Sequence, residues 1–185
     1  MSVKKMILLK LLSLICLLLV SATCGSVSFR NDNLGANPNP EPIPSDTLIT
    51  LKRGACYGPC PIYKLMISAD GTVVYEGQRY VKTAGVAKSR IDQEKLRRLI
   101  SEFENMDYFS MDDSYGAITL ITDSSQKRCP EFSTDKASAT TSIRMNGKSK
   151  SVYHYYGCEG LDRLKELTAL ENKIDEIANS KQWVS

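Results

Sequence analysis

The most chemically distinctive stretch of this chain runs from Cys56 to Tyr63 and reads Cys-Tyr-Gly-Pro-Cys-Pro-Ile-Tyr. Gly58 and Pro59 lie between the two cysteines and can fold back into a turn that brings their α-carbons within disulfide range. Redox-active pairs of the thioredoxin type instead have two intervening residues at a helix N-terminus. The spacing therefore favours a structural disulfide between Cys56 and Cys60.

His154 is the only histidine, so every enzyme mechanism that needs an imidazole depends on it. By ligand count, a thiol-redox or zinc site could be built from His154 and some of the cysteines: Cys56, Cys60 and either Cys129 or Cys158. The spacing matches no common zinc finger, and a Cys–His nucleophile pair would need a free thiol. No phosphate-binding glycine loop, HExxH or GxSxG motif occurs. We interpret His154 as a hydrogen-bonded strand residue at the domain edge, and expect no enzyme activity, no cofactor and no metal.

The start of the chain predicts an export signal. Lys4 and Lys5 precede an apolar run over residues 6–20, which is shorter than a membrane span requires, and small residues follow it. Two cleavage sites remain open. An ordinary signal peptidase would cut after Ala22, whereas a lipoprotein would be cut before Cys24 and would carry a lipid there, anchoring it to a membrane. We expect an exported protein, either periplasmic or held on the envelope by this lipid.

Export places the remaining cysteines in an oxidising compartment, where disulfides persist. Four cysteines outside the terminus allow three pairings. With Cys56 bonded to Cys60, the second bond joins Cys129 to Cys158 and closes a loop of about thirty residues. The loop-entropy model assigns this bond about 3–4 kcal/mol, against about 2 kcal/mol for the small ring.

Three segments follow from the composition: a signal peptide at 1–23, a linker or tether at 24–46 and one domain at 47–185. The prolines of the linker alternate with other residues over 38–44, which favours extended polyproline II. The signal holds three of the 24 basic residues, which leaves 21 against 21 acidic ones. A near-neutral mature chain is not expected to bind nucleic acid.

The domain begins with a short apolar strand at 47–52, and a β-hairpin follows at 61–77. A two-residue hairpin loop would mix the two faces of the sheet. A three-residue loop ending at Gly71 sets Ile67 opposite Val73 and keeps the apolar side chains together. We therefore predict this loop, with Gly71 in the left-handed conformation.

A second hairpin spans 140–155 around Asn146-Gly147, a sequence typical of a two-residue turn. Residues 111–137 are polar and are predicted to be mainly loop. With the first strand, the two hairpins supply one antiparallel sheet.

Two amphipathic helices complete the domain. Asp92 is a good N-cap for the first helix, and the last helix is predicted to begin near Gly160, with Glu171 and Asp175 on its polar outer side. The apolar stripe of the first helix consists of Leu96, Leu99, Ile100 and Phe103. Packing both helices on one face of the sheet buries every stripe, so we expect an α+β fold.

The run Gly-Ala-Cys-Tyr-Gly-Pro-Cys-Pro-Ile-Tyr at 54–63, followed by Asp-Gly-Thr-Val-Val-Tyr-Glu-Gly at 70–77, resembles a family of exported bacterial domains of unknown function. The resemblance spans about residues 47–185 and implies export and a shared fold. It implies no reaction, ligand or catalytic residue. Cys129 and Cys158 are additions to the family pattern.

Tyrosines near the cysteine motif and in the second hairpin could form a surface that binds a peptide or glycan. The candidate binding residues are Tyr57, Tyr63, His154 and Tyr155. The leading hypothesis is a non-enzymatic, disulfide-crosslinked envelope module that binds a protein, peptide or cell-wall component. The alternatives are a thiol or metal protein built on Cys56, Cys60 and His154, and a purely structural lipoprotein.

Overall fold

The computed structural model describes residues 41–116 and 129–185. The predicted signal peptide, Cys24 and the linker up to residue 40 lie outside the described residues. Within the described ranges, no helix is long and apolar enough to cross a bilayer.

A seven-stranded sheet forms the body of the domain, with the strand order β4-β3-β2-β1-β7-β8-β5. Its strands are β1 (Leu48–Arg53), β2 (Ile62–Ser68), β3 (Thr72–Arg79), β4 (Gly85–Arg90), β5 (Ser114–Tyr115), β7 (Ser138–Met145) and β8 (Lys148–Tyr155). A second, two-stranded sheet pairs β6 (Glu131–Phe132) with β9 (Cys158–Glu159). The helices are α2 (Gln93–Asn105), the 3-10 helix η1 (Tyr108–Ser110), α3 (Leu164–Ala178) and the short α4 (Lys181–Val184).

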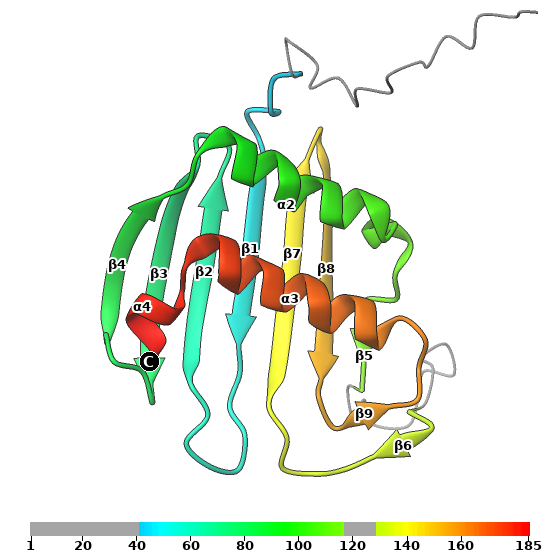
Figure 1. The fold of residues 1–185 in the computed structure, drawn as a ribbon. Coiled ribbons are helices and arrows are strands. Elements are labelled where there is room, and N and C mark those ends of the chain that lie inside the picture. Colours follow the sequence, from blue (N-terminus) through cyan, green and yellow to red (C-terminus); the bar gives the residue numbers. More distant parts are fainter. Residues whose placement is uncertain (1–40, 117–128) are drawn as a thin grey trace, which may run out of the picture. The chain divides into compact units, whose positions relative to one another are not determined.

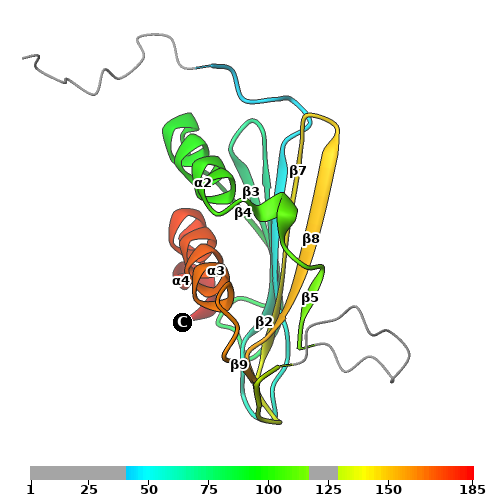
Figure 2. The same ribbon diagram turned by 90° about the vertical axis from the view of Figure 1, so that its right-hand side faces the viewer.

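The α+β prediction is confirmed, because α2 and α3 cross the strands on one face of the sheet, as Figures 1 and 2 show. The hairpin registers are also confirmed. Ile67 pairs with Val73, and Gly71 has a φ of 83°. Thr141 pairs with Val152 across the two-residue Asn-Gly turn. Alternation of apolar side chains was sufficient to fix both registers, because a slip by one residue would turn every apolar side chain to the other face.

Three details of the fold differ from the expectation. Strand β4 was not predicted, because most of its side chains are exposed at the sheet edge and carry no apolar alternation. The segment 111–137 contains the short strands β5 and β6, and β5 pairs with β8 in parallel, so the sheet is not wholly antiparallel. Helix α3 begins at Leu164, four residues after Gly160.

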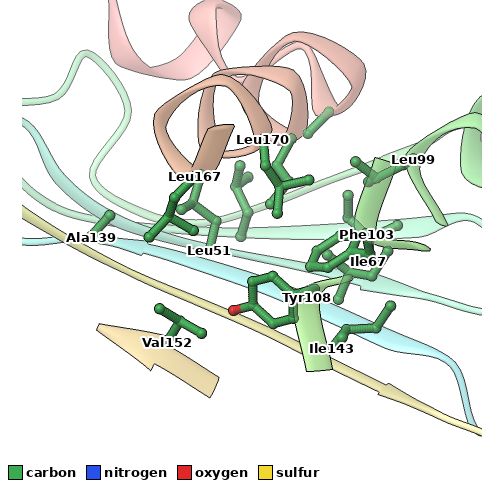
Figure 3. Close-up of a cluster of buried hydrophobic side chains, with 14 of the residues drawn as sticks. Leu51, Ile67, Leu99, Phe103, Tyr108, Ala139, Ile143, Val152, Leu167 and Leu170 are labelled. Atoms are coloured by element: carbon green, nitrogen blue, oxygen red, sulfur yellow. The ribbon is translucent and has the colours of Figure 1, made fainter. Parts of the chain in front are cut away.

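The core lies between the sheet and the two helices (Figure 3). Its fully buried side chains come from every central element: Leu51, Ile67 and Ile143 from strands, Leu99 and Phe103 from α2, and Leu167 from α3. Tyr108 of η1 enters the same core and donates a 2.7 Å hydrogen bond to the Thr141 carbonyl. Because that bond reaches the middle of β7, it ties the exit of α2 to the sheet.

Both ends of the described domain are fixed by side-chain contacts. The Asp46 carboxylate accepts the backbone N–H groups of Gly147 at 2.8 Å and Asn146 at 3.0 Å, and these bonds lower its pKa. At the other end, Trp183 stacks on Tyr75 with ring centroids 4.9 Å apart, which confirms that it anchors the tail. Contacts of the domain therefore begin just before residue 47 and extend to α4.

Candidate functional site

The structure contains two disulfides. Cys56 bonds to Cys60 with α-carbons 5.7 Å apart, in the connection between β1 and β2. Cys129 bonds to Cys158 with α-carbons 5.2 Å apart, and so links the chain entering β6 to its partner strand β9. None of these four cysteines is available as a thiolate for catalysis or metal binding while the bonds are intact.

The Cys56–Cys60 loop is held against the connection between β6 and β7. The Tyr57 N–H donates to the Asp135 carbonyl at 3.1 Å, and the Gly54 N–H donates to the Ser138 carbonyl at 2.7 Å. Figure 1 shows both connections at the same end of the sheet. Two backbone hydrogen bonds and a disulfide thus give this loop a defined position.

Aromatic side chains are exposed at this end of the sheet. Tyr57 is 89% exposed on the Cys56–Cys60 loop, and Phe132 of β6 is 46% exposed. Phe132 packs on Tyr155 with ring centroids 5.4 Å apart, and the Tyr155 hydroxyl donates to the Ser133 carbonyl at 3.0 Å. We call Tyr57, Phe132 and Tyr155 the aromatic end of the domain.

The structure separates the four candidate binding residues into two groups. Tyr57 and Tyr155 belong to the aromatic end. Tyr63 is buried on the helix-covered face, where its hydroxyl donates to Asp175 Oδ1 at 2.8 Å. His154 is also buried, and it lies under α3, not at the domain edge as expected.

His154 belongs to a buried polar network that connects β1, β8 and α3. Its Nδ1 lies 3.1 Å from Glu171 Oε1, and Tyr156 donates its hydroxyl hydrogen to Glu171 Oε2. Arg53 donates to the Tyr156 oxygen and to Asp175 Oδ2, the latter at 2.8 Å from Nη2. We call these five residues the Arg53 network.

Charge pairing holds the ionised groups of the Arg53 network in place. Burial disfavours the Arg53 guanidinium, but the nearby Asp175 carboxylate outweighs that penalty and raises the Arg53 pKa. Burial, followed by the charge of Glu171, raises the pKa of the Tyr156 hydroxyl. Tyr156 therefore stays protonated in the folded state and can donate to Glu171.

Glu171 corrects the sequence prediction. It was assigned to the polar outer side of the last helix, yet it is 0% exposed. The periodicity contained this signal, because position 171 follows Leu167 by four residues and precedes Ile174 by three, on the apolar stripe itself. Arg53 was not singled out, since nothing in the sequence shows that the end of β1 lies beneath α3.

A cavity of about 610 Å³ opens beside His154, between the end of β8 and the start of α3. Tyr156, Leu161 and Leu164 also line it, together with the disulfide-bonded Cys158. Neither Cys56 nor Cys60 lines this cavity. We call it the His154 cavity.

The His154 cavity places no free nucleophile beside the imidazole among its lining residues. The thiol of Cys158 is in a disulfide, and the Thr168 hydroxyl donates to the Leu164 carbonyl at 2.8 Å. Across residues 41–116 and 129–185, no three metal-ligating side chains form a group that could hold an ion. The geometry thus offers two features that a ligand could use, the aromatic end and the His154 cavity.

These features define a disulfide-crosslinked α+β domain with an exposed aromatic end and a buried ionic network. The family model for DUF6438, a domain of unknown function, matches residues 47–178, and the chain belongs to this family. A comparison with curated proteins found no match.

Proposed function

We propose that this protein is a non-enzymatic module of the bacterial cell envelope that binds a protein, peptide or glycan through its aromatic end. The predicted export signal and proline-rich linker would deliver the domain beyond the cytoplasm and hold it away from a membrane. A lipid on Cys24 would supply the anchor.

The observation that carries the proposal is the exposure of Tyr57 on a loop that a disulfide closes. An aromatic side chain that stays in water gives up apolar burial, and a ligand can recover it. Tyr57 also loses little conformational entropy on binding, because the loop beneath it is already ordered by the Cys56–Cys60 bond and by Asp135. Phe132 adds a second exposed ring on the neighbouring connection.

A binding comparison with a matched control tests the proposal. Residues 42–185, which form one compact unit, would be immobilised and exposed to envelope extract and to purified peptidoglycan. The test variant is Tyr57→Ser/Phe132→Ser. The control is Tyr80→Ser, since Tyr80 is also exposed but lies beyond β3.

We expect one component to be retained by the wild type and by Tyr80→Ser, and its retention to fall at least about tenfold in the double variant. Equal retention by all three forms would exclude the aromatic end as the binding surface. Robust turnover by the wild type in a hydrolase and oxidoreductase screen would refute the non-enzymatic assignment.

A further inference from the structure

We propose that the His154 cavity is a second binding site, for a small amine with an apolar body. The cavity volume of about 610 Å³ falls within the range of about 300–1,000 Å³ that is typical of small-molecule sites. His154 lines this space although it is only 2% exposed. The site is distinct from the aromatic end and does not depend on it.

The hydrogen bond to Glu171 sets the chemistry that His154 offers to the cavity. A carboxylate oxygen can only accept, so the Nδ1 of a neutral imidazole carries the hydrogen that Glu171 receives at 3.1 Å. Tyr156 donates to the other oxygen of Glu171, so both oxygens act as acceptors. Nε2, on the opposite edge of the ring, is therefore left with a lone pair and needs a donor.

Within residues 41–116 and 129–185, Nε2 has no hydrogen-bond partner. Three other buried side-chain polar atoms in these ranges lack a partner, and all three are hydroxyl oxygens: Thr47 Oγ1, Ser114 Oγ and Thr141 Oγ1. Because Nε2 is not among these sealed atoms and His154 lines the cavity, Nε2 meets the cavity space. A ligand that donates a hydrogen bond there would satisfy it.

The charges around the cavity favour a cationic donor. Two exposed carboxylates, Glu159 and Asp162, line the cavity against one ammonium, Lys165. Behind His154, the carboxylates of Glu171 and Asp175 outnumber the single guanidinium of Arg53. The surroundings are therefore net negative on both sides, which favours an alkylammonium over an alkyl carboxylate.

The apolar walls select for a carbon skeleton on the same ligand. Leu161, Leu164 and the Tyr156 ring line the cavity, and Leu164 itself is buried. An amine whose nitrogen donates to Nε2 would lay its hydrocarbon part along these side chains. Burial of that part supplies affinity, while Nε2 and the carboxylates supply selectivity.

Three probes with one alkyl tail test this inference: hexylamine, hexan-1-ol and hexanoate. Because His154 is the only histidine, its imidazole nitrogen resonances in an NMR titration need no assignment. We expect hexylamine to shift the Nε2 resonance saturably and to bind at least about tenfold more tightly than hexanoate, with hexan-1-ol between them.

Exposed variants keep the test independent of folding. Glu159→Gln/Asp162→Asn should weaken hexylamine binding at least about threefold and leave hexan-1-ol binding unchanged, since it removes charge alone. Glu104→Gln removes an exposed carboxylate at the end of α2 and should change neither. The inference would be overturned by hexanoate binding as tightly as hexylamine, by equal hexylamine binding in Glu159→Gln/Asp162→Asn, or by an Nε2 resonance that no probe shifts.

Discussion

Removal of the Arg53 guanidinium is the perturbation that most sharply tests the energetics of this fold. Arg53→Met keeps an apolar stem of similar length under α3 but leaves two carboxylates without their cation. The Arg53 side chain is 14% exposed, Glu171 is 0% exposed, and the closest Arg53 contact to each carboxylate is 2.8 Å for Asp175 and 3.6 Å for Glu171.

The magnitude follows from this burial. Breaking a buried ion pair by removing one partner costs about 3–5 kcal/mol, because the remaining charge stays desolvated and uncompensated. Domains of this kind have a free energy of unfolding of about 5–15 kcal/mol, so the loss is a large share of the total. Lys52→Met is the matched control, since Lys52 is the exposed neighbour on β1, and it should change the free energy of unfolding by no more than about 0.5 kcal/mol.

Urea unfolding followed by tryptophan fluorescence measures the effect directly. Trp183 is the only tryptophan, and it is buried against Tyr75, so its emission reports the packed core. Adding Glu171→Gln to Arg53→Met should restore part of the lost free energy, because it removes the stranded charge. A loss below about 1 kcal/mol for Arg53→Met, or no recovery in the double variant, would refute the assigned role of the network.

Three further predictions concern the disulfide, the tyrosines and a helix cap. Cys129→Ala/Cys158→Ala opens a loop with a sequence separation of 29 residues and should lower the free energy of unfolding by about 3–4 kcal/mol in the same urea assay. Burial raises the pKa of Tyr63 and Tyr156, so the stability that depends on their protonated forms is complete below pH 10 and is lost as pH rises above it; Tyr156→Phe should reduce the fall in urea midpoint between pH 9 and 11. Asp92→Ala removes the 2.7 Å cap on the Lys95 N–H of α2 and should cost about 1 kcal/mol by thermal unfolding, whereas Asp92→Asn should cost less.

The sequence was sufficient for the elements whose side chains alternate between core and solvent. The three-residue loop at Gly71 follows from the need to keep Ile67 and Val73 on one face, and the stripe of α2 follows from helical spacing. Strand β4 follows from neither. At a sheet edge the backbone can pair without burying a side-chain face, so no periodic signal arises.

The candidate site was only partly predictable, because its parts come together through tertiary packing. His154 and Tyr57 were identified by residue type and motif. Arg53 could not be connected to Glu171, since strand order places β1 between β2 and β7 and only then beneath α3. Glu171 was assigned to the wrong side because its charge was weighed above its position on the apolar stripe.

The aromatic end depended on information that no single segment carries. Phe132 lies in a polar stretch and has no neighbour in sequence that would suggest a surface. It comes to the same end as Tyr57 because β6 pairs with β9 and the following connection accepts the Tyr57 N–H. Such a surface can be identified only once strand pairing is known.

The central claim is that the domain cysteines are crosslinks and not reagents. Intact mass, measured without reductant on protein recovered from the envelope fraction of its native cells, tests it most directly. We predict a mass lower than that of the reduced chain by the four hydrogens of two disulfides, with Cys56 joined to Cys60 and Cys129 joined to Cys158 in the peptide map. Protein from that fraction with all four thiols free would contradict both the crosslinked structure and the binding function built on it.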